Sequence, residues 1–304
     1  MQKTSIRLIP VIALLAILSI LMTLVGVNIR TVHAAQSTVN LQTASPFAIL
    51  SGTPGITDAG NASTIKGNVG LSPATGAGIG LNCSQVTGTI YSVDGAGPLP
   101  CRVTDGPLLV AAKNHLTAAY TDAATRTPLT TVPTELGGTT LTAGVYDSSS
   151  TTFGITAGAG PLRLDGQNDP SSVFIFQAPF NGTGLTVGSG SSIVLENGAQ
   201  ACNVFWRVDT ANIGTGATFV GTVLALNSIT VQNGATVSGR LLARNGAVTL
   251  ENNTITIPAC AASVPGLPNS GELKGQSVLL AAVSLFVLTV GSFLGYAFYK
   301  KHSA

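Results

Sequence analysis

Residues 216–257 read GATFVGTVLALNSITVQNGATVSGRLLARNGAVTLENNTITI, and three parts of this stretch are nearly the same. The hexapeptides GATFVG (216–221), GATVSG (234–239) and NNTITI (252–257) begin eighteen residues apart. A short fixed period of strand-forming residues, with Gly or Asn at the corners, is typical of a solenoid in which each repeat forms one coil. The sequence therefore predicts a stack of β-coils.

Each repeat contains a threonine that stacking would place in one column, at the strand spacing of about 4.8 Å. Strand alternation turns this threonine outward, puts the following apolar residue into the core, and turns the next residue outward again. Residues 64–69 share the pattern Thr, apolar, any, Gly, any, apolar with residues 218–223, which adds an N-terminal coil to the stack. The predicted binding surface consists of Thr64, Lys66, Thr218, Val220, Thr236, Ser238, Thr254 and Thr256. The uneven second column leaves open that another face binds.

A different periodicity occupies residues 107–126. Pro107 stands where a helix tolerates proline, at its start, and Thr127-Pro128 ends the pattern. Apolar residues spaced three and four apart predict an amphipathic helix of roughly five turns. They are Leu108, Leu109, Ala112, Leu116, Ala119, Tyr120 and Ala123. The flank of the solenoid is the only large surface against which this helix could be buried.

The composition argues against nucleic acid as a partner. The chain has 304 residues, of which 9% are charged, and its formal net charge is +2. Six of the 14 Lys and Arg residues lie in the two terminal segments, which leaves eight basic against eleven acidic residues between Ala35 and Gly271. A domain with a net charge of about −3 lacks the basic surface that nucleic-acid binding requires.

The first 34 residues predict a signal peptide. Lys3 and Arg7 precede an apolar run over 8–27, and Val32-His33-Ala34 is a small-residue cleavage site. The mature chain would then begin at Ala35 or Gln36. An uncleaved N-terminal anchor is the alternative, since the run is long enough to span a membrane.

The C-terminal end predicts a surface anchor. A Pro/Gly/Ser-rich linker (261–276) follows the domain expected over 45–260, then an apolar transmembrane helix (277–299) and a short cytoplasmic tail (300–304). Within the linker, Leu267, Pro268, Asn269, Ser270 and Gly271 resemble the LPxTG sorting signal of Gram-positive surface proteins. A sortase would cut before Gly271 and join the domain to the cell wall. Ser270 replaces the usual Thr, so a plain membrane anchor is the alternative.

Four cysteines in an exported chain predict two disulfides, for which three pairings are possible. The favoured pairing is Cys83 with Cys101 and Cys202 with Cys260. A metal site is the rival interpretation, but His115 is the only histidine in the exported domain and no CxxC motif occurs. No metal and no cofactor are expected.

Several separated motifs resemble one family, the DUF3494 ice-binding proteins, over about residues 45–260. They are Leu136-Gly137-Gly138, 142–146 (TAGVY), 173–177 (VFIFQ), 203–206 (NVFW) and 239–250 (GRLLARNGAVTL). The resemblance implies a mainly β fold: a discontinuous right-handed parallel β-helix of triangular section. In that fold the N-terminal coil inserts among later coils and a long helix packs along one side.

The resemblance also implies ice binding by a flat, threonine-rich face at the cell surface. Threonine suits ice because its methyl keeps the face partly apolar, its hydroxyl holds a water, and its β-branch fixes χ1. No enzyme is expected, because the carboxylates of Asp165, Asp169, Glu196, Asp209 and Glu251 are scattered along the chain. An adhesin for glycans or another cell surface is the alternative, and it would need a groove with exposed aromatics rather than a plane.

Overall fold

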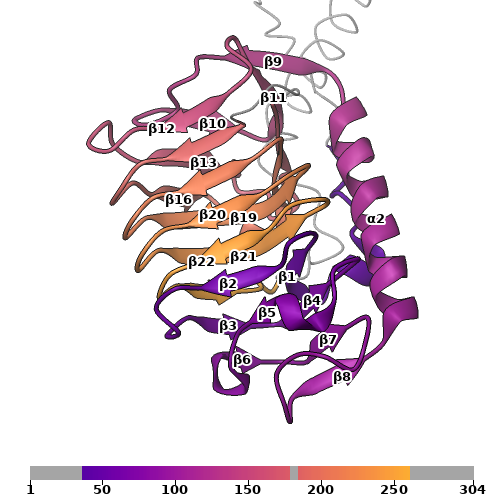
Figure 1. The fold of residues 1–304 in the computed structure, drawn as a ribbon. Helices are drawn as coiled ribbons and strands as arrows, with labels where there is room; N and C mark the ends of the chain where they lie inside the picture. Colours follow the sequence, from indigo (N-terminus) through magenta and orange to yellow (C-terminus); the bar gives the residue numbers. More distant parts are fainter. Residues whose placement is uncertain (1–35, 179–183, 261–304) are drawn as a thin grey trace, which may run out of the picture. The chain divides into compact units, whose positions relative to one another are not determined.

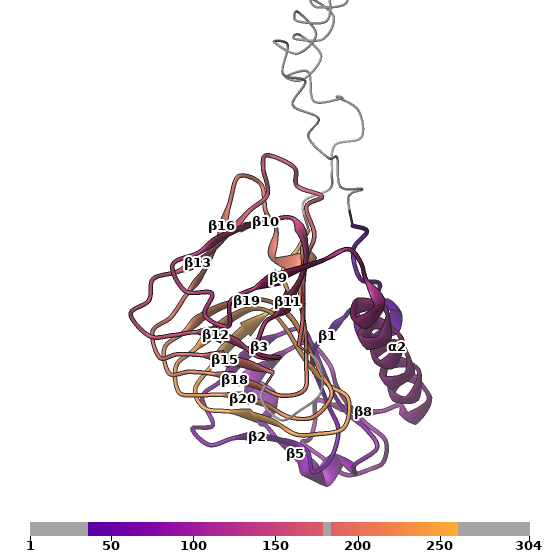
Figure 2. The same ribbon diagram turned by 90° about the horizontal axis from the view of Figure 1, so that it is seen from above.

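A computed structural model describes residues 36–178 and 184–260 of the chain. Over these residues the fold is mainly β, and the predicted helix is present as α2 (Gly106–Thr125). The strands pair in parallel and form three faces around one core, with α2 beside one of them (Figures 1 and 2).

Both predicted terminal segments lie outside the described residues. This holds for the signal peptide (1–34), the linker (261–276) with its sorting motif, the transmembrane helix (277–299) and the tail (300–304). Within the described ranges, no helix is both long and apolar enough to cross a membrane.

Face a is the sheet beside α2. Its strands, in spatial order, are β8 (Arg102–Thr104), β7 (Ile90–Ser92), β4 (Asn68–Leu71), β1 (Phe47–Ser51), β21 (Thr236–Ala243), β19 (Thr218–Ala225), β17 (Val204–Val208), β14 (Phe174–Gln177), β11 (Gly144–Ser148) and β9 (Leu129–Val132).

Face b is a sheet of seven short strands. In spatial order these are β12 (Phe153–Ile155), β15 (Leu185–Val187), β18 (Ala211–Ile213), β20 (Ile229–Val231), β22 (Val248–Leu250), β2 (Ile56–Asp58) and β5 (Ile79–Gly80).

Face c continues from three strands into the first halves of two long ones. It consists of β10 (Thr140–Thr142), β13 (Leu162–Asp165), β16 (Ile193–Glu196), the beginnings of β19 and β21, β23 (Thr254–Thr256), β3 (Thr64–Lys66) and β6 (Val86–Thr87).

The two long strands turn from face c to face a at a glycine. Gly221 in β19 has a φ of +113°, which a side chain would strain. A Cβ there would also approach the Val204 side chain to 2.8 Å and the Trp206 indole nitrogen to 2.9 Å. Gly239 occupies the matching position in β21, where a Cβ would lie 1.8 Å from the Gly221 carbonyl oxygen. The glycines of the repeat are therefore required by the corner.

The stack is discontinuous in sequence. Strand β1 lies between β21 and β4, β2 lies between β22 and β5, and β23 lies between β21 and β3. The N-terminal segment (47–104) therefore continues the stack below the last C-terminal coil, and α2 returns the chain to the opposite end (Figure 1). The family resemblance implied an N-terminal coil inserted among later coils, and this part of the expectation is wrong. The N-terminal strands lie together at one end of the stack, because β1 and β3 pair with β21 and β23 of the last C-terminal coil.

Two buried clusters hold the coils together. The interior of the solenoid contains Phe176 stacked on Trp206, with ring centroids 3.9 Å apart, and the Trp206 indole donates to the Val220 carbonyl. Between face a and α2, Leu109 and Leu116 of the helix are fully buried with Phe47, Leu50 and other residues from both segments. Each such leucine contributes about 1.5–3 kcal/mol through burial. Because this cluster includes residues of the N-terminal and the C-terminal segments, α2 holds the two segments together.

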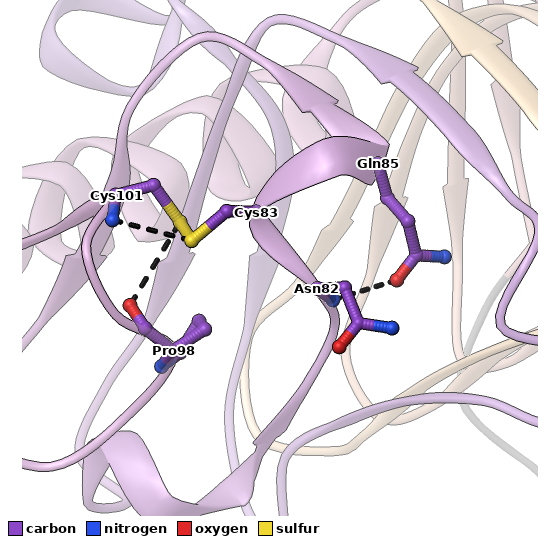
Figure 3. Close-up of a disulfide and its surroundings, with 5 residues drawn as sticks. All are labelled: Asn82, Cys83, Gln85, Pro98 and Cys101. Carbon is purple, nitrogen blue, oxygen red and sulfur yellow. Dashed lines mark hydrogen bonds between the residues drawn. A yellow bond between two sulfur atoms is a disulfide. The ribbon is translucent and has the colours of Figure 1, made fainter.

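The structure contains both favoured disulfides, Cys83–Cys101 and Cys202–Cys260. Figure 3 shows the first, which joins the two ends of a segment that contains β6 and β7; the Cys101 amide donates to the Cys83 sulfur. The second joins the short 3-10 turn η4 (Ala201–Asn203) to the end of the described chain.

Candidate functional site

The predicted threonine column lies on face c, in the predicted register. Thr218, Thr236, Thr254 and Thr64 are consecutive rungs, and all four side chains are exposed. We call these four residues the face c ladder. Ser192, directly before β16, forms an isolated parallel bridge with Thr218 and so occupies the next position in this column.

The second column of face c corrects one part of the prediction. Lys66 is exposed, and Ser238 and Thr256 are half-buried, but Val220 is only 6% exposed and belongs to the core cluster. Val220 is buried because another part of the chain packs on it, which strand alternation alone cannot predict. The turn η4 packs beside β19 and β21 at this corner, and its Ala201 is part of the same cluster as Val220.

Charged side chains flank the face c ladder. Arg163 on β13 forms an ion pair with Glu196 on β16, and Asp165 lies opposite Glu196 in the register. Lys66 lies beside the lowest rung of the ladder. These charges limit the area of face c that is free of charge.

Face b carries a longer outward column. The central residue of each strand points away from the core, and parallel pairing places these residues in one row across all seven strands. The row is Gly154, Thr186, Asn212, Thr230, Thr249, Thr57 and Gly80. We call its five polar members the face b ladder. None of the seven residues is charged.

The neighbours of the face b ladder are small, and one polar member is held in place. Thr210, Ser228 and Ala247 lie in the adjacent outward column, and all three are partly exposed. The Gln232 amide donates to the Asn212 side-chain oxygen, which restrains the one residue of the ladder that is not β-branched. Charged residues lie at the margins of this face: Glu251, and Glu135, which pairs with Gly154 at the end of the row and accepts from the Thr156 amide. The result is an uncharged row with restricted side-chain freedom.

Sequence reasoning did not identify the face b ladder, although a signal was present. Four of its strands have the form small residue, apolar, Thr, then the end of the strand: 184–187 (GLTV), 228–231 (SITV), 247–250 (AVTL) and 55–58 (GITD). These tetrapeptides have no fixed spacing, because loops of different length separate the coils and one of them, 55–58, belongs to the N-terminal segment. The eighteen-residue repeat was therefore the more visible pattern.

Face a is closed by α2 and is rich in cations. Tyr120 of the helix lies between the guanidinium groups of Arg207 and Arg244, at 4.6 and 4.8 Å from its ring centroid. The Lys113 ammonium donates to the Ala243 carbonyl, and burial together with Arg244 lowers the pKa of Lys113 to about 8. This face has neither the access nor the neutrality of face b.

A buried carboxylate supports the corner between faces b and c. Asp58 is 6% exposed and accepts hydrogen bonds from the Ser63 amide, the Gln85 side-chain amide and the Asn252 amide. Burial acts to raise the pKa of Asp58, but these bonds outweigh it and leave the pKa below its usual value. Asn252 comes from the C-terminal segment and the other three residues from the N-terminal one, so this cluster fixes the junction that both ladders cross.

The remaining carboxylates form no metal-binding cluster in the part of the chain that the structure describes: no group of three or more His, Cys, Asp and Glu side chains there could hold a metal ion. Asp169 contacts Ser171 in its own loop, and Asp209 accepts from Asn227.

Of the acidic residues weighed for catalysis, Asp165 and Glu196 are neighbours in the register, which the sequence did not predict. Glu196 forms an ion pair with Arg163, and Asp165 accepts from the Gln167 amide and the Asn197 side chain.

Three comparisons with known proteins agree. A family model described as ice-binding-like matches residues 49–256. An ice-binding protein of Colwellia sp is 45% identical over 224 residues, covering 72% of this chain and 84% of that protein. An ice-binding protein of Flavobacterium frigoris (strain PS1) is 42% identical over 224 residues, covering 72% of this chain and 76% of that protein.

A solved structure shares the architecture. The DUF3494 domain of Shewanella frigidimarina ice-binding protein 1 matches with a TM-score of 0.65 and 31% identity, over 75% of this chain and 100% of that chain. A chain limited to this domain therefore folds by itself. The described part of the present chain, with both cores and both disulfides, corresponds to that unit.

Proposed function

The chain belongs to the ice-binding-like family, and on that premise we propose that it binds ice through face b. The observation that carries the proposal is the uncharged row of seven registered residues with five polar members. Ice is an uncharged periodic solid, so a binding face must present a regular, rigid and weakly polar array. The threonines supply a methyl and a hydroxyl at each rung, and their fixed χ1 limits the entropy lost on binding.

The position of the chain ends supports the choice of face b over face c. The N-terminal segment enters beside α2, where Thr43 bonds to His115 and the Arg240 guanidinium donates to the Ser45 carbonyl. At the other end, Cys260 is bonded to Cys202 in the turn between faces c and a. Face b carries neither α2 nor a chain end. The face c ladder, which is shorter and flanked by charges, is the second candidate surface.

An adhesin that binds glycans is not favoured. A glycan groove would need exposed aromatic side chains, and the large hydrophobic residues exposed in the described ranges are Leu99, Val103, Val110 and Leu129, all of them aliphatic. We propose a non-catalytic role, which the engagement of the one adjacent pair supports: Glu196 forms an ion pair with Arg163, and Asp165 accepts from Gln167 and Asn197. The relatives in the comparisons are ice-binding proteins, which supports the same conclusion.

We also propose that the domain is exported and held at the cell surface. Two disulfides suit an extracellular location. The N-terminal apolar run, the C-terminal apolar helix and the sorting-type motif predict export and then a membrane or cell-wall anchor. A tethered domain would act where the cell meets ice, by adhesion or by limiting ice growth there. The right-handed winding of the coils is what the family resemblance implies, and it remains part of this proposal.

The test uses the domain from Gln36 to Ser263, assayed for inhibition of ice recrystallisation and for partition into slowly growing ice. Thr249→Lys would place a charge within the face b row, and we expect partition to fall at least about tenfold, or 1.4 kcal/mol. Thr121→Lys on the exposed side of α2 is the matched control and should behave as the parent. Absence of activity in the folded parent domain would reject ice binding, whereas full activity in Thr249→Lys would reject face b.

A further inference from the structure

Strand β23 by itself provides only a short attachment for the C-terminal end of the solenoid. Strand β23 has three residues, and it pairs with β21 on one side and β3 on the other. It is also the strand through which the C-terminal segment meets the N-terminal one on face c. Force applied to the chain beyond Cys260 would therefore act first on a short strand at the junction of the two segments.

The Cys202–Cys260 disulfide provides a second path for that force. Cys202 lies in η4, directly before β17, and β17 pairs with β14 and β19 on its two sides. Strand β17 is fully buried and carries Trp206, which stacks on Phe176 in the core. A pull on Cys260 is thus transmitted covalently to one of the most firmly packed strands of the stack, and β23 is bypassed.

We infer that the Cys202–Cys260 disulfide is the connection that transmits force from the surface tether to the solenoid. The inference rests on the proposed tether. It assigns this disulfide a mechanical role: it keeps the junction of both ladders closed while a cell is pulled relative to the ice. The Cys83–Cys101 disulfide (Figure 3) joins two residues of the N-terminal segment and lies off this path.

Single-molecule pulling without ice tests the inference. One handle is attached through Thr186→p-azidophenylalanine on face b and the other at the C-terminal end of the domain. In the parent, we expect no extension before the solenoid unfolds. In the double variant Cys202→Ser/Cys260→Ser, we expect an early step at lower force, as β23 detaches and releases roughly seven residues, or about 25 Å.

The double variant Cys83→Ser/Cys101→Ser is the matched control and should show no early step. Full extension checks the state of the disulfide, because the covalent path between the handles is about 16 residues with it and about 74 without, or roughly 55 and 260 Å. If Cys202→Ser/Cys260→Ser does not fold, the control variant can be pulled before and after reduction of its folded form. Absence of the early step once Cys202–Cys260 is broken would overturn the inference. Because no ice is present, that outcome is independent of whether the domain binds ice.

Discussion

Faces b and c are built from the same coils, yet face b carries an uncharged row across seven strands, whereas face c carries four threonines beside charged side chains. Both rows have the strand spacing of a parallel sheet, about 4.8 Å. They differ in length, in neighbouring charge, and in their distance from α2 and the chain ends. A column of threonines on a β-helix is therefore not sufficient evidence for a binding face.

The largest effect is expected at the corner between faces b and c, because both ladders cross it. Asp58→Asn removes a buried charge that accepts three hydrogen bonds, one of them from Asn252 across the junction, and we expect the free energy of unfolding at pH 7 to fall by about 1–3 kcal/mol. Chemical denaturation measures the change. The exposed Glu251→Gln at the same corner is the control and should change the free energy by less than about 0.5 kcal/mol.

The pH dependence of stability gives a second test of this corner. The pKa of Asp58 is lowered in the folded state, so its stabilising contribution is present above the unfolded-state pKa of about 3.9 and is lost as the pH falls through the lower folded value. The parent should lose more stability than Asp58→Asn when the pH is lowered below about 4. Equal losses in both proteins would contradict this role.

The sequence predicted one ladder and not the other, because only the face c strands recur at a fixed spacing. The face c ladder was predictable because Gly216–Gly221 and Gly234–Gly239 repeat at a fixed spacing and Thr64 recurs in the same local pattern. The helix was predictable from its three-and-four spacing. The face b ladder was not, because its strands share only a tetrapeptide pattern and the N-terminal segment continues the row after the last C-terminal strand, where Thr57 pairs with Thr249. The burial of Val220 was also hidden, since it depends on η4, which packs from outside the repeat.

A smaller effect would sharpen the comparison from the side of face c. Lys66→Thr removes the charge beside the lowest rung and makes that end of face c chemically similar to face b. If face b binds ice, partition into ice should change by less than about twofold, or roughly 0.4 kcal/mol. An increase of tenfold or more would show that face c contacts ice and that Lys66 limits it.

The most direct test of the central claim applies one substitution to both ladders. Thr230→Tyr lies in the middle of the face b ladder and Thr236→Tyr in the face c ladder, and circular dichroism would check that both variants remain folded. Partition into growing ice is then measured for the parent and the two variants. We predict that Thr230→Tyr lowers partition at least about tenfold and that Thr236→Tyr stays within about twofold of the parent. Loss in folded Thr236→Tyr with full activity in Thr230→Tyr would contradict the assignment of ice binding to face b.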